Sequence, residues 1–435
     1  MPNRVALDQN LPNISESEAL YARARGLIPA GTQTLAKGPT QFVDGVAPKY
    51  LARGKGCRVW DVDGNEYIDL SMGVGPLVLG YSYPRVDEAV REQLAQGITF
   101  SLMHPLEVEV AELVRSLVPG ADAVRFSKTG CDVTSAAVRL ARAYTGRERV
   151  LCCGYHGWHD WYVGTTARSA GVPAAARQLT EAIPYNDTSA LFDRIDTSVA
   201  CVILEPMIFE QPEHDFLRIV KRACEDTGAL LVFDEMWTGF RLALGGAQEF
   251  FDVTADLACF SKAVANGMPL SVLTGRSDVM RLLDEDVFFF TTFGGEALSL
   301  AAARATLLEL QEKRVCGELA RQGRRLAHGY EQLAREKGLL GTRVLGADCR
   351  SLITFDAAFG DPLLQKSLMQ QELLRHGVLW SGFHNLCLSH TDADVEHVLA
   401  AYDRALDALA RAIDRGELES SILGRPVQPV FRKTR

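Results

Sequence analysis

Between about residue 120 and residue 275, short continuous apolar runs alternate with stretches of helical periodicity. The runs are AVRF at 123–126, RVLCCG at 149–154, VACVILEP at 199–206, ALLVFDE at 229–235 and LACFSK at 257–262. Strands that are apolar throughout are buried on both faces, which is typical of a parallel sheet covered by helices. We therefore expect an α/β fold with a mostly parallel sheet and helices on both of its faces.

The two ends of the chain show other patterns. Alternating runs on either side of Asp63-Gly64, in CRVWDVDGNEYIDL, predict a β-hairpin. Helical spacing predicts helices over 16–28, 84–97, 105–119 and 392–413, a helical segment near 297–337, and a helix beginning near Val133. We expect a large domain over 76–310 and a smaller domain built from 1–75 and 311–435.

Composition excludes several classes of protein. The chain has 435 residues and a net charge of −9, which argues against a nucleic-acid binder, and we interpret the basic end at 432–435 as a solvated tail. It contains no apolar run of about 18 residues, so we expect no membrane span and no membrane partner. Its ten cysteines form no CxxC pair and no zinc spacing, which predicts free thiols, no metal and a cytoplasmic location.

Charged and polar residues cluster where the predicted strands end. Glu205 ends the apolar part of the third run, Asp234 and Glu235 end the fourth, and Lys262 ends the fifth. The second run ends in Gly-Tyr-His at 154–156, and the first opens into SKTGCD at 127–132, just before a helix. Any one of these polar ends could be structural. Because the carboxyl ends of parallel strands share one edge of a sheet, we expect the five ends to converge there.

Together these groups suit one kind of ligand. A small-residue loop at a helix N-terminus binds phosphate, an aromatic ring stacks on a heterocycle, a carboxylate pairs with a ring nitrogen, and a lysine amine attacks an aldehyde. Burial would keep that amine neutral and nucleophilic. The set predicts pyridoxal 5'-phosphate (PLP). A nicotinamide-dependent dehydrogenase is disfavoured, because no GxGxxG follows the first strand of the sheet.

The sequence resembles the class III (fold type I) PLP aminotransferases, especially the branch near glutamate-1-semialdehyde aminomutase, from about residue 20 to about residue 410. Five ordered segments carry the resemblance: KTGCD at 128–132, GYHGWHD at 154–160, FDEMWTGFR at 233–241, FSKAVANGMPLS at 260–271 and TTFGGEALS at 291–299. It implies a seven-stranded, mostly parallel sheet in the large domain, a small α+β domain from both chain ends, and a homodimer with shared active sites.

The resemblance also assigns catalytic roles. Lys262 would hold the cofactor as a Schiff base and shuttle the proton of the reaction. Asp234 would pair with the protonated ring nitrogen, and Tyr155 would stack on the ring. Met236 would pack against the other face of the ring and His156 would orient nearby polar groups. A core aromatic is an alternative for Tyr155, a core methionine for Met236 and a structural histidine for His156.

Further positions are assigned to the phosphate and the substrate. Thr129, Gly130 and Cys131 would bind the phosphate, with Cys131 standing where relatives carry a hydroxyl residue, and Thr292 would complete the phosphate site across a dimer interface. We also place Glu205 in the cofactor pocket. Glu210 would help the pocket alternate between donor and acceptor, although a surface role is an equal alternative.

Two positions bear on the reaction. Lys37, in PAGTQTLAKGP, stands nearest to an arginine that binds the substrate carboxylate in the semialdehyde enzyme, and Val74 falls on one of its active-site tryptophans. A lysine lacks the bidentate fork of arginine. We therefore expect transfer of an amino group from a donor such as glutamate to a separate acceptor, a keto-sugar or keto-cyclitol. An intramolecular aminomutase and a non-catalytic scaffold are the alternatives.

Overall fold

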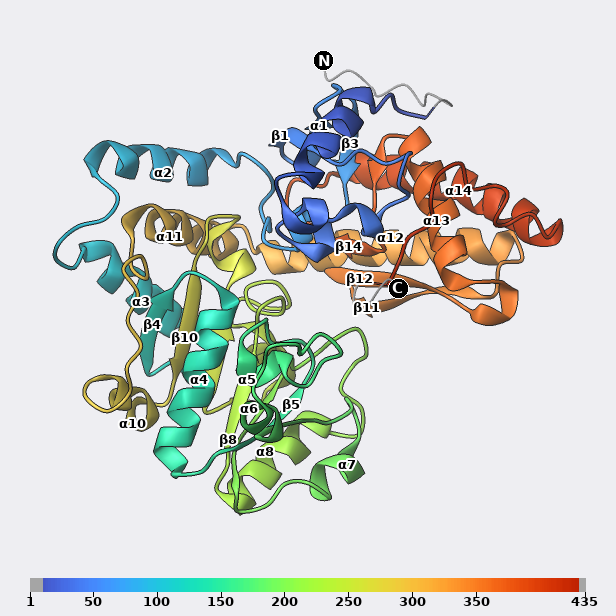
Figure 1. Ribbon diagram of the computed structural model, residues 1–435. Coiled ribbons are helices and arrows are strands. Elements are labelled where there is room, and N and C mark those ends of the chain that lie inside the picture. The colour runs from blue at the N-terminus through green and yellow to red at the C-terminus, as the bar shows by residue number, and fades with distance from the viewer. Residues whose placement is uncertain (1–10, 430–435) are drawn as a thin grey trace. The chain divides into compact units, whose positions relative to one another are not determined.

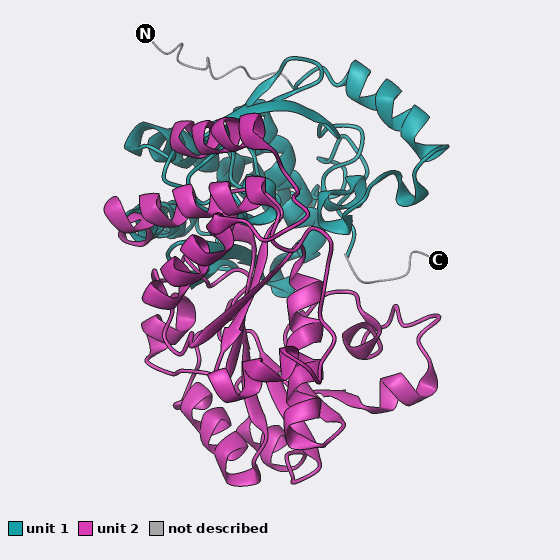
Figure 2. Cartoon of the chain, turned by 90° about the vertical axis from the view of Figure 1, so that its left-hand side faces the viewer, with its two compact units in different colours: residues 1–83, 318–435 teal, residues 84–317 magenta. Residues whose placement is uncertain are grey.

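The computed structural model describes residues 11–429, so the basic end at 432–435 lies outside the described residues. The chain divides into two compact units, residues 84–317 and residues 1–83 with 318–435 (Figure 2). The first is one continuous stretch and the second combines both chain ends. No helix among the described residues is long and apolar enough to cross a membrane.

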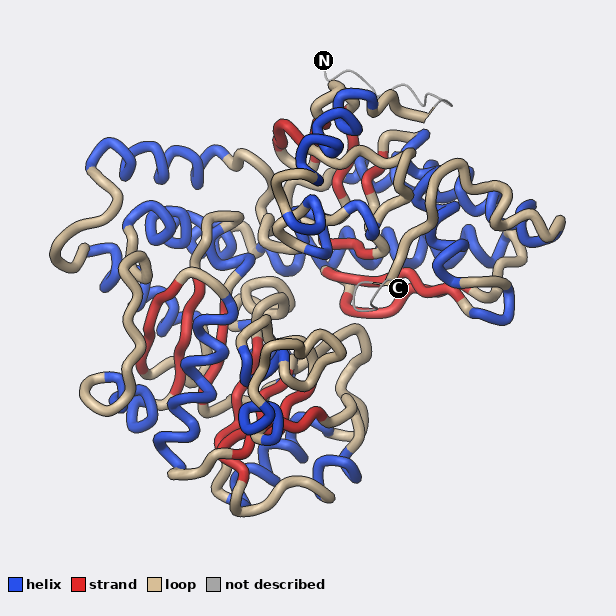
Figure 3. The backbone as a smooth tube through the Cα atoms, in the orientation of Figure 1, coloured by secondary structure: helices blue, strands red, loops and turns tan. Residues whose placement is uncertain are grey.

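The unit over 84–317 is built on a seven-stranded sheet of order β4-β10-β9-β8-β7-β5-β6 (Figure 3). All neighbouring strands are parallel except β10, which is antiparallel to both β4 and β9. The strands are β4 Ala123–Ser127, β5 Arg149–Cys153, β6 Thr180–Ala182, β7 Val199–Leu204, β8 Leu230–Asp234, β9 Leu257–Phe260 and β10 Ser271–Gly275.

Helices pack on both faces of this sheet, as the apolar runs predict. Successive residues of a strand point to opposite faces, so Val150 and Cys152 join a core under α4 (Gly130–Thr145), while Leu151 and Cys153 join a second core under α8 (Phe216–Thr227) (Figure 1). The other helices of this unit are α2 Pro84–Gln96, α3 Pro105–Leu117, α5 Asp160–Val163, α6 Ala174–Gln178, α7 Thr188–Phe192, α9 Gly246–Phe251, α10 Ser277–Met280 and α11 Ala297–Glu312.

The unit made from the chain ends has two small sheets, of order β1-β2-β3-β13 and β11-β12-β14. The predicted hairpin is confirmed, because β2 and β3 pair antiparallel on either side of Asp63-Gly64, and Gly64 takes the left-handed φ of 90° that the turn needs. Its elements are α1 Ser15–Arg25, β1 Leu51–Lys55, β2 Arg58–Asp61, β3 Glu66–Asp69, α12 Val315–Glu336, β11 Thr342–Ala347, β12 Arg350–Phe355, α13 Pro362–Arg375, β13 Val378–Leu379, β14 Phe383–Asn385 and α14 Asp392–Asp414.

Three predicted helical segments differ from the observed helices, and the first of them, expected over 16–28, is α1, which ends at Arg25. The helix expected near Val133 begins at Gly130, because Thr129 and Asp132 cap it reciprocally, each side chain accepting from the backbone N–H of the other. The segment expected near 297–337 is two helices, α11 and α12. They are separated at Arg314, whose left-handed φ of 51° interrupts a regular helix.

Candidate active site

The register of the sheet aligns four strand ends. Cys153 of β5 lies opposite Leu204 of β7, and Leu204 lies opposite Phe233 of β8. One residue further along, Asp234 of β8 lies opposite Cys259 of β9. Because these strands are parallel, the segments that follow them leave the sheet at the same edge, as the sequence predicts.

Lys262 follows the end of β9 in a strained loop. Its backbone φ is 45°, in the left-handed region that a lysine rarely adopts. The loop is closed behind it, because the Ser261 hydroxyl donates to the Leu270 carbonyl at 2.7 Å. Strain of this kind persists where the surrounding structure imposes it and is concentrated at functional sites. The half-buried Lys262 is therefore held in place by its backbone.

Asp234 and His156 form a buried pair. Asp234 is 1% exposed and His156 is 2% exposed, and the distance from His156 Nδ1 to Asp234 Oδ2 is 2.8 Å. The other ring nitrogen, Nε2, lies 3.1 Å from the Cys153 carbonyl, and the second carboxylate oxygen of Asp234 accepts from the Met236 N–H at 3.1 Å. His156 therefore orients the Asp234 carboxylate.

Glu205 lies in the same pocket. Its carboxylate accepts from the Tyr155 N–H at 2.7 Å. Burial raises the pKa of Glu205, and the negative charge of Asp234 adds to this effect, while His156 and Lys262 act in the opposite direction. Asp234, His156 and Lys262 therefore all lie close enough to Glu205 to act on its charge.

The first turn of α4 lies beside the same groups. A Cβ on Gly130 would come within 2.7 Å of Met236 Sδ, and a Cβ on Gly157 would come within 2.4 Å of Cys131 Sγ. Burial raises the pKa of the Cys131 thiol, and a hydrogen bond from the Trp158 backbone opposes this. The turn at 129–131 is thus packed against the segments that carry Tyr155 and Asp234, with glycines at the points of closest approach.

Tyr155 presents an accessible ring beside these charged groups. The residue is 54% exposed, and its ring meets Tyr162 edge-on at a centroid distance of 5.6 Å. Burial raises the pKa of Tyr155, as do the neighbouring Cys131, Asp234 and Glu205. An exposed ring near buried carboxylates is suited to stack on a planar heterocycle.

Two further candidates lie in exposed loops of this unit, and two belong to the other unit. Thr292 is exposed in the loop between Phe288 and Glu296, and Glu210 is exposed in the loop after β7. Lys37 and Val74 belong to the unit built from the chain ends. Lys37 is exposed, whereas Val74 is partly buried and has a left-handed φ of 72°.

Sequence reasoning gave no role to Lys128, although the residue stands inside the segment KTGCD. Its Nζ lies 2.6 Å from Glu296 Oε1 and also contacts Ser299 Oγ and the Pro269 carbonyl. Glu235, beside Asp234, faces away from this chemistry. Its fully buried carboxylate accepts from the N–H groups of Ala247 and Gln248 at the start of α9.

The donor set of this site fits PLP: helix N–H groups for the phosphate, a buried carboxylate for the ring nitrogen, an accessible aromatic ring and an amine. A fold type I sheet with such a site defines a PLP-dependent enzyme.

Comparison with known proteins identifies the family. Residues 44–405 match the sequence profile described as "Aminotransferase class-III". The chain therefore belongs to the class-III aminotransferase family and is a PLP-dependent transaminase.

Individual relatives differ in their named reactions. The chain is 33% identical to the 3-aminobutyryl-CoA aminotransferase of Cloacimonas acidaminovorans over 90% of this chain and 97% of that protein. It is 35% identical to the glutamate-1-semialdehyde 2,1-aminomutase of Methanopyrus kandleri over 91% and 98%. Family membership alone therefore leaves the substrates open.

Solved structures agree on the fold. The FumI protein of Sphingopyxis sp. MTA144, in its PLP internal aldimine form, has a TM-score of 0.85 and 32% identity over 92% of this chain and 97% of that one. The β-phenylalanine aminotransferase of Variovorax paradoxus has a TM-score of 0.81 and 26% identity over 95% and 96%.

Proposed function

We propose that this transaminase transfers an amino group between two separate substrates, from an amino-acid donor, glutamate, to a keto-sugar or keto-cyclitol acceptor. The observation that carries the proposal is the pair Lys37 and Val74, at the positions where the resemblance expects an arginine and a tryptophan. No arginine occurs anywhere in 29–39. A single amine cannot bind a substrate carboxylate bidentately, and a valine in place of a tryptophan leaves room for a bulkier acceptor.

PLP, when bound, supplies an electrophilic aldehyde and an electron-withdrawing ring. Lys262 Nζ would hold the group at its aldehyde and would carry the proton of the transfer. Asp234, oriented by His156, holds the proton of the ring nitrogen. The first turn of α4, at Gly130 and Cys131, binds the phosphate, and the Tyr155 ring covers one face and excludes water.

The names of the relatives define the rival substrates. An intramolecular aminomutase is favoured by the 35% identity to the Methanopyrus kandleri enzyme. A β-amino compound is the rival amino donor, because 3-aminobutyryl-CoA and β-phenylalanine stand in the names of the Cloacimonas acidaminovorans and Variovorax paradoxus proteins.

A donor and acceptor screen, read from the spectrum of the bound cofactor, tests the proposal. Glutamate should convert the bound aldehyde to the amine form, and a keto-sugar or keto-cyclitol should restore it. Lys262→Ala should lower the rate of both half-reactions by about 10²–10⁴-fold, because the proton carrier is lost. Turnover of glutamate-1-semialdehyde without a second substrate would contradict the proposal, as would conversion by β-amino acids but not by glutamate.

A homodimer is part of this proposal. Exposed apolar side chains gather on two adjacent segments of the 84–317 unit, where the Ala297 N–H donates to the Ile98 carbonyl at 2.9 Å. They are Ile98, Phe100, Leu102, Met103, Phe288, Phe290 and Phe293, with exposures of 41% to 82%. A monomer rarely exposes such a patch. Thr292 lies within it, available to a second copy, and light scattering should give twice the mass of one chain.

A cytoplasmic location also remains a prediction. All ten cysteines lie in the described part of the chain and none of them forms a disulfide there, which supports a reducing compartment.

A further inference from the structure

Lys128 joins three segments that are far apart in the sequence. Its Nζ donates to Glu296 Oε1 at 2.6 Å, to the Pro269 carbonyl at 3.0 Å and to Ser299 Oγ at 3.1 Å. The side chains of this ion pair are only 19% and 9% exposed, for Lys128 and Glu296 respectively. A lysine has three donor hydrogens, and here each has an acceptor from a segment other than its own.

Each of these segments carries part of the site. Lys128 directly precedes Thr129, the N-cap of α4. Pro269 belongs to the loop that begins at Lys262 and is closed by the Ser261–Leu270 hydrogen bond. Glu296 caps α11 by accepting from the N–H groups of Leu298 and Ser299, and it ends the loop that carries Thr292. One ammonium therefore connects the α4 turn, the Lys262 loop and the Thr292 loop.

The charges of Lys128 and Glu296 affect the site as well as their positions. Burial raises the pKa of Glu296, but hydrogen bonds from Lys128 and Ser299 outweigh burial, so the pKa lies below its ordinary value. Glu296 is therefore an anion at neutral pH. Without Lys128, the Glu296 carboxylate would be a largely buried anion with no positive charge to compensate it. Only the Lys128 side chain separates this carboxylate from the first turn of α4, which must bind the negatively charged phosphate.

We propose that Lys128 is a positioning residue for the cofactor phosphate: it fixes the first turn of α4 against the Lys262 and Thr292 loops and neutralises Glu296 beside them. This inference rests on the proposed assignment of the turn at 129–131 to the phosphate. It extends that assignment, because the same ammonium links the turn to the loop that we expect to reach the second copy's site.

Titration of the apoprotein with PLP and with pyridoxal, which lacks the phosphate, tests this inference. Lys128→Met should weaken PLP binding by about 10-fold or more, which is the size of a lost charge-assisted hydrogen bond, and should change pyridoxal binding by less than about 2-fold. Lys128→Arg, which keeps the charge, should restore most of the PLP affinity. Lys128→Gln keeps hydrogen-bond donors but loses the charge. It should also weaken PLP binding, as Lys128→Met does, while disturbing the fold less.

Lys337 provides a matched control. Its Nζ binds Asp403 and Asp407 at 2.7 and 2.6 Å, and its side chain is 16% exposed, so it resembles Lys128 in burial and in pairing with carboxylate, with two partners in place of three, but it belongs to the other unit. Lys337→Met should lower thermal stability and leave the ratio of PLP to pyridoxal affinity unchanged.

The outcomes separate the two proposals. If the wild-type apoprotein binds PLP but Lys128→Met and Lys128→Gln leave the affinity ratio unchanged, or weaken both ligands equally, the role of Lys128 is wrong and the proposed function stands. If borohydride fails to fix PLP to Lys262 in the wild type, the assignment of the site is wrong, and the role of Lys128 is wrong with it.

Discussion

Gly154 occupies the point where β5 leaves the sheet and turns toward Tyr155. Its φ is 105°, and a Cβ there would lie 2.7 Å from Glu205 Oε1. Any side chain would therefore meet both a backbone penalty and the carboxylate that accepts from the Tyr155 N–H. Gly154 therefore allows the segment that carries Tyr155 to approach Glu205 this closely.

Gly154→Ala should lower the free energy of unfolding by about 1–3 kcal/mol and should also weaken PLP binding, because Glu205 must move. Gly146→Ala is the control. Gly146 has a similar left-handed φ of 67° but nothing within 4 Å of its Cβ position, so its cost should be limited to about 1 kcal/mol. Urea unfolding and PLP titration measure both effects, and equal losses in the two variants would contradict the argument.

The identities of the site residues could be predicted better than their pairings. The strand-end positions of Lys262 and Asp234 are visible in the sequence, because a charged residue closing an apolar run is unusual. The bonds from His156 to Asp234 and from Tyr155 to Glu205 depend on the register between β5, β7 and β8, which no local pattern fixes. Lys128 was overlooked because a charge after a strand ordinarily faces solvent.

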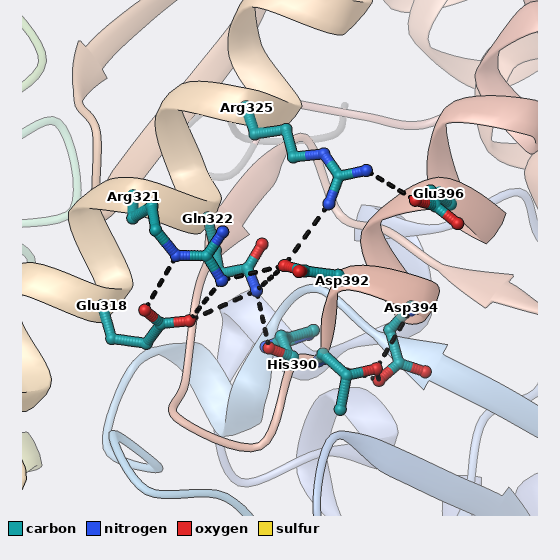
Figure 4. A network of polar contacts seen from close by, with 9 residues as sticks. Glu318, Arg321, Gln322, Arg325, His390, Asp392, Asp394 and Glu396 are labelled. Atoms are coloured by element: carbon teal, nitrogen blue, oxygen red, sulfur yellow. Dashed lines mark hydrogen bonds and ion pairs between the residues drawn. The ribbon is translucent and has the colours of Figure 1, made fainter.

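At the scale of elements, a polar network joins α12 to the start of α14 (Figure 4). Arg321, Gln322 and Arg325 all approach Asp392. Asp394, two residues further on, caps α14 by accepting from Thr391 and also pairs with Arg58 of β2 at 2.7 Å. The Asp392 side chain is 58% exposed and that of Asp394 is 8% exposed.

Burial should decide which of these two carboxylates stabilises the unit. Asp392→Ala should cost less than about 1 kcal/mol, since exposed ion pairs are screened by water. Asp394→Ala should cost about 1–3 kcal/mol, because a helix cap is lost and the charge of Arg58 is left without its less exposed partner. Thermal unfolding of the two variants measures the difference, and a larger loss for Asp392→Ala would refute this ranking.

Most large-domain strands were predictable, and the exceptions have physical reasons. All five apolar runs form strands, β4, β5, β7, β8 and β9. The edge strand β6 was missed because it is three residues long and exposes Glu181 and Ala182. The antiparallel strand β10 was missed because it follows a Gly-Met-Pro bend directly, without the intervening helix that identified the other strands.

At the scale of the whole molecule, each unit contains a buried group whose titration changes its stability, Glu235 in one and His384 in the other. Burial raises the pKa of Glu235 from 4.5 to about 7, so its stabilising contribution is present below pH 4.5 and is lost as the pH rises through 7. Burial lowers the pKa of His384 from 6.5 to about 3, so its contribution is present above pH 6.5 and is lost as the pH falls through 3. Between pH 4.5 and 6.5 the two units therefore respond in opposite directions.

The 84–317 unit should lose stability between pH 5 and pH 8 as Glu235 ionises. In Glu235→Gln this loss should be smaller by about 2–3 kcal/mol, the size expected for a pKa shift of this magnitude. Hydrogen exchange in β8 and α9 reports on this unit separately. Glu249→Gln makes the same change at an exposed position of α9 and should leave the pH dependence as it is. An unaltered slope in Glu235→Gln would contradict the assignment.

The discontinuous unit has a consequence for synthesis on the ribosome. Residues 84–317 can fold as soon as they emerge, whereas β3 must wait for β13, and Asp44 and Thr40 must wait for Arg425 and Gln428 to bond with them. At the usual rates of translation this delay is roughly 20–70 s. During that interval the N-terminal segment is an unfinished half of a domain, so slower translation of the last hundred codons should prolong its exposure to chaperones and proteases.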